Sequence, residues 1–199
     1  MSLMDTLASV VTSQIASEAA KKTGMNEGLA AQLMPMAVAA MMGGLKKNTS
    51  NPQGAQALAS ALDNHDGSLL SNLSQLSSDG VMADGQKILG HILGGKQAQT
   101  EKALAKTAGV DVGQVGSLMA MAAPALLAAL GKAKRDDGLD AAGLAGLVTQ
   151  EGVRAQQAAP NELGGLMQFL DQDGDGDFKD DLLETAGKKL FGSLFGGRN

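Results

Sequence analysis

The sequence contains no cysteine, no tryptophan and no tyrosine, and only four of its 199 residues are phenylalanine. Without cysteine, the chain has no disulfide, no thiol nucleophile and no thiolate metal site. It also has only three arginines and a net charge of −5. Proteins that bind nucleic acid usually carry basic patches and aromatic side chains that stack on bases. Nucleic acid is therefore not expected as a partner.

The N-terminal residues lack the basic start and the unbroken apolar stretch of a secretory signal peptide, so we expect a cytoplasmic protein. Two long uncharged runs, 28–45 and 112–131, are borderline for a membrane span, which needs about 20 apolar residues. Each run contains Gln, Gly and one internal proline. We interpret both as buried core helices and expect no transmembrane segment.

The residues that are abundant predict an all-α fold. Hydrophobic residues make up 44% of the chain, which includes 27 glycines and 11 methionines. Small side chains let helices approach closely, and methionine fills irregular gaps between them. The β-branched and aromatic residues that favour strands are scarce.

Segments of the N-terminal half recur 85 residues later in the chain. The recurring pairs are 23–25 with 108–110, 33–37 with 118–122, and 40–45 with 125–130. Both halves close on an apolar run that ends in paired glycines, at 94–95 and 196–197. The repeat predicts two tandem, pseudo-symmetric helical units, 1–95 and 96–199, packed through their long Ala/Met-rich helices. Two independent bundles are the alternative. Pro35 and Pro124 are expected to kink or split those long helices.

A cluster of acidic residues near the C-terminus predicts a calcium site in the second unit. Seven of the chain's 21 acidic residues lie between Asp171 and Glu184. An EF-type calcium loop supplies ligands from places one, three, five and seven, with glycine at six. The candidate ligands in that pattern, together with two later acids, are Asp171, Asp173, Asp175, Asp177, Asp180 and Asp181. We therefore predict Ca2+ as the cofactor.

The back half of this loop departs from the EF pattern. Place twelve, where a bidentate carboxylate belongs, is Leu182, so Asp180 or Asp181 must complete the coordination shell. An acidic turn without metal is the alternative, because Asp-Gly pairs favour turns. The corresponding segment of the first unit, 77–80, has lost nearly all of these acids. The turn alone therefore does not require them, which favours a cation.

No other motif indicates catalysis. His65 is predicted to be a solvated residue at a helix C-terminus, and His91 a half-buried structural residue. No nucleophile–base arrangement and no phosphate-binding loop is present, so we expect a protein that is not an enzyme.

The order of several segments resembles the YidB-like bacterial family, a domain of unknown function numbered 937. The segments that carry the resemblance are 88–97, 104–110, 118–130, 138–140 and the acidic loop with Leu182 and Leu183. The resemblance implies a small all-helical bacterial protein without established enzyme activity. It also implies that an Asp/Gly loop ending in two aspartates is a trait of the family.

These observations together predict a non-enzymatic binding or interaction module with one calcium loop. Its partner is either an unknown protein or a second copy of the chain. The alternative is a self-assembling structural protein, because the apolar residues 190–195 favour association and the acidic loop is then only a turn.

Overall fold

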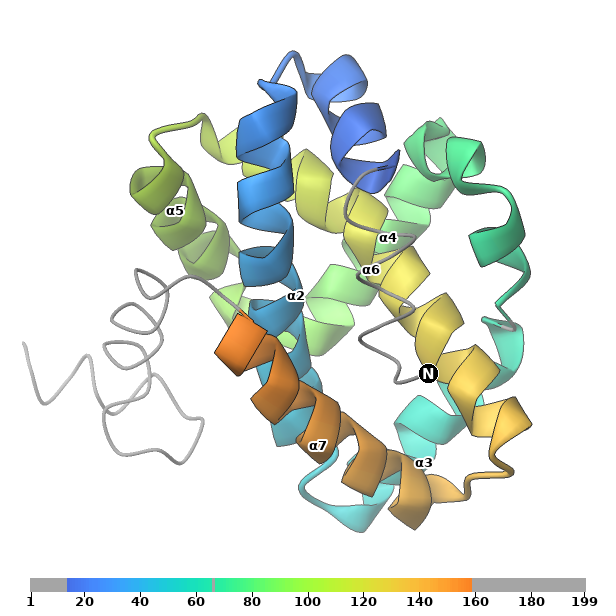
Figure 1. Ribbon diagram of the computed structural model, residues 1–199. Coiled ribbons are helices and arrows are strands. Elements are labelled where there is room, and N and C mark those ends of the chain that lie inside the picture. Colours follow the sequence, from blue (N-terminus) through green and yellow to red (C-terminus); the bar gives the residue numbers. More distant parts are fainter. Residues whose placement is uncertain (1–13, 66, 159–199) are drawn as a thin grey trace, which may run out of the picture. The chain divides into compact units, whose positions relative to one another are not determined.

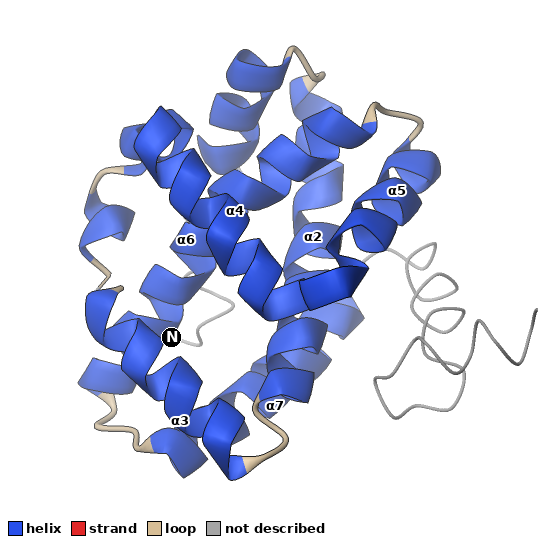
Figure 2. Cartoon of the chain, turned by 180° about the vertical axis from the view of Figure 1, so that it is seen from behind, coloured by secondary structure: helices blue, strands red, loops and turns tan. Residues whose placement is uncertain are grey.

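The computed structural model describes residues 14–65 and 67–158, which lie within one compact unit, Met1–Pro160. Helices make up most of this part of the chain, and none of the residues it describes forms a strand (Figures 1 and 2). The predicted all-α class is confirmed.

The described elements follow one another with short connections. A first helix covers residues 14–23. The longer elements after it are α2 (Glu27–Asn48), α3 (Pro52–Ala61), α4 (Asp79–Leu93), α5 (Gln97–Ala108), α6 (Val112–Asp136) and α7 (Ala141–Ala158). Short 3-10 helices are η1 (Leu62–Asn64), η2 (Ser68–Ser71), η3 (Leu73–Ser77) and η4 (Gly94–Lys96).

Helix α6 forms the centre of the fold. Every residue from 115 to 131 except Ser117 is buried. The helix packs against α2, α4, α5 and the three 3-10 helices η1 to η3, so its apolar surface is covered on several sides (Figure 1). The uncharged run of α6 therefore forms a large part of the hydrophobic core of this unit.

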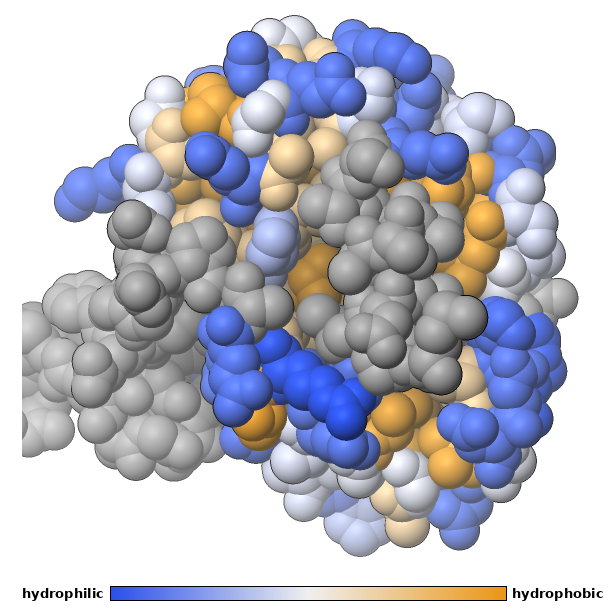
Figure 3. Space-filling model, viewed as in Figure 1, coloured by the Kyte–Doolittle hydropathy of each residue, from blue (hydrophilic) through white to orange (hydrophobic). Residues whose placement is uncertain are grey.

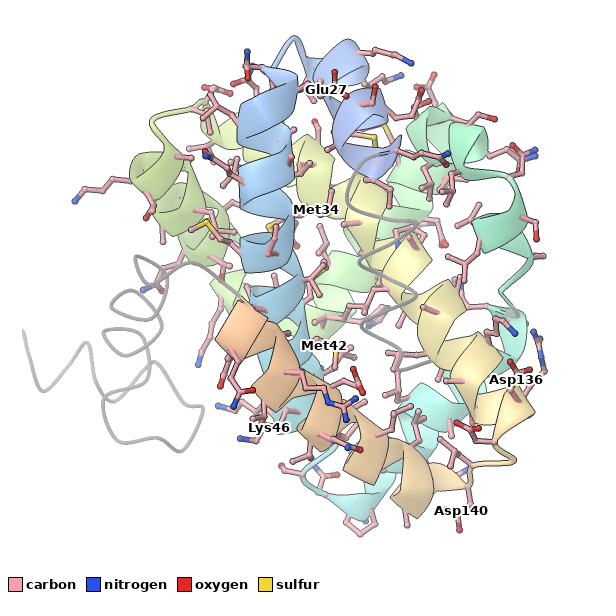
Figure 4. The ribbon with its side chains drawn as sticks, viewed as in Figure 1. Glu27, Met34, Met42, Lys46, Asp136 and Asp140 are labelled. Carbon is pink, nitrogen blue, oxygen red and sulfur yellow. The ribbon has the colours of Figure 1, made fainter. Side chains whose placement is uncertain are left out.

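Helix α2 lies against α6, as the sequence predicts for the two long Ala/Met-rich helices, and also contacts α4, α5 and α7. Met34 and Met42 are almost fully buried, whereas Glu27 and Lys46 occupy the two ends of the helix (Figure 4). An acid at the N-terminus and a base at the C-terminus both interact favourably with the helix dipole.

On the face of the molecule seen in Figure 3, hydrophilic side chains gather along α7 and around the edge.

Helices α4 and α6 cross at very close range. A Cβ atom added to Gly85 on α4 would overlap the carbonyl oxygen of Ala120 on α6. Only glycine permits this approach, because any other residue places a carbon atom where the neighbouring backbone lies. Ile88, Leu89 and Ile92 are buried on the same face of α4.

Local structure recurs at the spacing of the sequence repeat. Gly24 and Gly109 both adopt left-handed backbone conformations, with φ of 70° and 67°. Asn26 and Asp111 then cap α2 and α6, each by accepting a hydrogen bond from a backbone N–H of the first turn. The division into units 1–95 and 96–199 stays a prediction, because much of the second lies outside the described residues.

Each long helix continues through its proline. Pro35 lies inside α2 and Pro124 inside α6, and neither helix ends there, so the expected split does not occur. By length and composition, α2 and α6 are apolar enough to cross a membrane. However, 61% and 78% of their most apolar windows are buried inside the fold, as is typical of core helices.

Candidate ligand-binding groove

A cavity of about 860 Å³ opens between α3 and α4, and we call it the α3–α4 groove. Both helices lie on the side of the molecule that faces the viewer in Figure 2. Its lining residues come from four regions: Leu45, Lys47, Asn48, Ser50 and Asn51 at the end of α2; Gly54, Ala57, Leu58, Ala61 and His65 at α3 and η1; Asp84, Lys87, Ile88, His91 and Ile92 on α4; and Leu127 on α6.

The floor of the groove and its α3 wall are apolar. The buried side chains Leu45, Leu58, Ile88, Ile92 and Leu127 form the floor. On α3, Gly54, Ala57, Leu58 and Ala61 recur every three or four residues and therefore share one face of the helix. Three of these four residues are Gly or Ala, so Leu58 is the one residue of this α3 lining with a side chain that extends beyond Cβ.

The α4 wall is polar. Asp84, Lys87 and His91 are exposed and are spaced three and four residues apart, so they follow one edge of the helix. The predicted half-buried position of His91 is wrong. The side chain lies about 100° around the helix from buried Ile92, beyond the apolar stripe that faces the core.

Hydrogen bonds fix the two walls relative to the core. The Asn48 side-chain amide at the end of α2 donates to the carbonyl oxygens of His91 and Ile92, at 3.0 and 3.1 Å. These carbonyls belong to the last turn of α4, where backbone acceptors lack partners within the helix. These hydrogen bonds hold the last turn of α4 against the end of α2, beside the groove.

The α3 wall is held to α6 by Lys134. Its ammonium group donates to the carbonyl oxygen of Ala59 at 2.7 Å and pairs with the Asp63 carboxylate at 2.6 Å. The Lys134 side chain is 19% exposed and the Asp63 side chain is 70% exposed, so water screens the charge pair, and the hydrogen bond to Ala59 is the better protected contact. Both walls are thus positioned before any ligand binds.

His65 also lines the groove. It follows η1, and its backbone N–H donates to the Leu62 carbonyl at 3.1 Å. The predicted place at a helix C-terminus is therefore confirmed, but the residue is half-buried rather than fully solvated. A Cβ added to Gly131 on α6 would overlap the His65 carbonyl oxygen, so close packing against α6 sets the position of this turn.

The charges on the groove are mostly positive. Its two lysines, Lys47 and Lys87, outnumber its single carboxylate, that of Asp84. Lys87 makes no ion pair with any residue in the part of the chain that the structure describes. This local balance differs from the net charge of −5 for the whole chain.

The predicted calcium ligands lie outside the described residues. This applies to Asp171, Asp173, Asp175, Asp177, Asp180 and Asp181. Among residues 14–65 and 67–158, no group of three or more His, Asp or Glu side chains is arranged to hold a metal ion.

A comparison with protein families gives one match. The family described as bacterial protein of unknown function (DUF937) matches residues 5–133, which is more than half of the chain. The chain belongs to this DUF937 family. The match covers α2 to α5 and most of α6, and therefore every residue that lines the groove, but it ends before α7 and before the acidic loop. No curated protein and no solved structure matches the chain.

The groove is not evident from the sequence. His65 and His91 lie 26 residues apart on different elements, although both line the same cavity. Two local signals were available: the small residues Gly54, Ala57 and Ala61 along one face of α3, and the polar edge of α4 beside Ile88. Neither signal shows from sequence which helix faces the other.

Proposed function

We propose that this DUF937 protein is a non-enzymatic binding module that holds a small, largely apolar molecule in the α3–α4 groove. The observation that carries the proposal is a pre-formed cavity of about 860 Å³ with an apolar floor and polar groups on the α4 wall and at the end of α2. Sites for small molecules typically measure about 300–1,000 Å³ and have this composition.

The size of the groove favours a small molecule over a protein partner. Sixteen residues line the groove, whereas a stable protein interface uses about 20–30 residues on each side. The α3 wall from Gly54 to Ala61 is about 10 Å long, since a helix rises about 1.5 Å per residue. A partner helix would be held over about two turns only.

The contacts of the polar groups support binding rather than catalysis. Ser50 lines the groove together with His65, His91 and Asp84, which are residue types of a hydrolase site. However, the Ser50 hydroxyl donates to the Lys47 carbonyl at 2.7 Å. No hydrogen bond joins it to a histidine within the described residues, so the nucleophile–base pair of acyl transfer is not formed.

The test uses the neutral apolar dye N-phenyl-1-naphthylamine, whose fluorescence rises in apolar surroundings. Ala57→Trp fills the groove with a large side chain and should weaken dye binding by about tenfold or more, roughly 1.4 kcal/mol. Ala98→Trp on α5 is the matched control, because Ala98 is also exposed on a helix and lies outside the groove. Equal dye affinity in both variants would contradict the proposed site.

We propose, in addition, that the acidic loop binds one Ca2+ ion, with Asp180 or Asp181 completing the coordination. The support comes from the sequence: carboxylates at places one, three, five and seven and Gly176 at the turn. These carboxylates repel one another when no cation is present. Calcium binding would stabilise the folded chain by mass action.

Thermal melting of the full chain in calcium, in magnesium and in chelator tests the calcium proposal. A ligand at 100 times its Kd adds about 2.7 kcal/mol. For a chain of this length, that corresponds to a rise in Tm of about 5–10 °C. The double variant Asp171→Ala with Asp173→Ala should melt like wild type in chelator and lose the calcium response. An unchanged calcium response in the double variant, or an equal response to magnesium, would refute the site.

A further inference from the structure

We infer that the ligand of the α3–α4 groove is an amphiphile with an apolar body and an anionic end, such as a medium-chain carboxylate. The inference rests on the proposed function and adds the chemical class of the ligand. The apolar body would lie along α3 and over the buried floor, and the anionic end would lie at Lys87 and His91 on α4.

The distribution of charge carries the inference. On the α4 wall, Lys87 and His91 are four residues apart, so their side chains are neighbours on one edge of the helix. Both side chains are exposed and carry N–H donors. Lys47 and His65 also line the groove, away from this edge of α4. An anionic group on an apolar ligand is the complement of this surface.

Asn48 removes an obstacle to anion binding near His91. The last carbonyl oxygens of a helix carry partial negative charge and would repel an anion. Two of those carbonyls on α4, those of His91 and Ile92, accept hydrogen bonds from the Asn48 side-chain amide. The C-terminal turn of α4 therefore presents fewer acceptors to the anionic end of the ligand.

The α3 wall of the groove is suited to the apolar body of the ligand. Ala57 and Ala61 are exposed on α3 and line the groove, and neither has atoms beyond Cβ. The floor beneath them consists of leucine and isoleucine side chains. A hydrocarbon chain that lies against this wall is stabilised by the burial of its apolar surface. The groove thus has an apolar wall on α3 and a polar wall on α4, where Lys87 and His91 supply N–H donors beside Asp84.

The experiment compares two ligands of the same chain length, decanoate and 1-decanol, in displacing N-phenyl-1-naphthylamine from the full chain at low salt. Decanoate is expected to bind about two- to fivefold more tightly than 1-decanol, the range expected for one exposed charge pair. Lys87→Gln should abolish this preference without changing the affinity for 1-decanol. Asp84→Asn should enlarge it by removing the one acid on the lining.

Lys102→Gln on α5 is the charge-matched control, because Lys102 is exposed and lies outside the groove. It should keep the wild-type preference. Raising the salt concentration to about 1 M should reduce the preference for decanoate, because screening acts on the charge pair and not on apolar contacts.

The outcomes separate the inference from the proposed function. Displacement of the dye by both ligands with equal affinity, or a preference for decanoate that Lys87→Gln leaves intact, overturns the inference and leaves the binding module standing. Failure of both ligands to displace the dye, or failure of the dye to bind wild type, overturns both.

Discussion

The close crossing of α4 and α6 gives a sharp prediction at Gly85. Gly85→Ala adds one methyl group at a point where the ideal Cβ position overlaps the carbonyl oxygen of Ala120. The atom that the methyl group would overlap belongs to the backbone rather than to a flexible side chain, so the overlap is relieved only by moving one helix away from the other. Gly90→Ala on the same helix is the matched control, because no atom lies within 4 Å of its added Cβ.

The magnitude follows from two opposing terms. Replacing glycine by alanine inside a helix stabilises the folded state by about 0.5–1 kcal/mol, because alanine loses less backbone entropy. At Gly85 the helices must separate by about 1 Å or more, which forfeits a large part of the dispersion energy across the interface. Overpacking in a core costs about 1–3 kcal/mol and occasionally more. We expect Gly85→Ala to lower the free energy of unfolding by about 1–3 kcal/mol.

Calorimetry and urea unfolding of the two single variants measure the difference. For a chain of this length, Gly85→Ala should lower Tm by roughly 2–10 °C, and Gly90→Ala should raise it by about 1–4 °C. A Gly85→Ala variant that melts at or above the temperature of Gly90→Ala would refute the close α4–α6 crossing. Such a result would also place Ile88 and Ile92 differently and remove the floor of the groove.

Two further predictions concern contacts away from this crossing. Asn48→Ala should lower the free energy of unfolding by about 1 kcal/mol, because two carbonyls of α4 lose their donor. The variant should also bind the dye more weakly in the α3–α4 groove. An unchanged Tm together with an unchanged dye affinity would contradict this prediction. The hydrogen bond from Lys21, and then that from Ser77, holds the pKa of Glu18 below its ordinary value of 4.5. The resulting stability is present above about pH 4.5 and is lost as pH falls through the lower folded-state pKa. Ser77→Ala should raise the pKa of Glu18 in an NMR titration, and an identical pKa in the variant would contradict the contact.

Local features of the fold were predictable from the sequence. The recurrence at 85 residues correctly paired Gly24 with Gly109, which share the left-handed conformation before a long helix. The apolar runs also identified α2 and α6 as core helices that pack together. Such features depend on neighbouring residues, so a single sequence contains the information needed to find them.

The candidate site depends on contacts between distant segments. Its walls come from α3 and α4, and Leu127 on α6 contributes to its floor. The sequence gives the polar edge of α4 but not the helix that faces it. The apolar neighbours of His91 in the sequence suggested partial burial, whereas the helical period turns this residue out of the buried face. The calcium loop stays a prediction, because its residues lie outside the described part of the chain.

A crystal structure of the full chain with decanoate would show whether the α3–α4 groove binds an anionic amphiphile. We expect ligand density along Ala57 and Ala61, with the carboxylate beside Lys87 and His91 on α4. Decanoate bound elsewhere on the chain, with the α3–α4 groove empty or filled by protein side chains, would contradict this expectation.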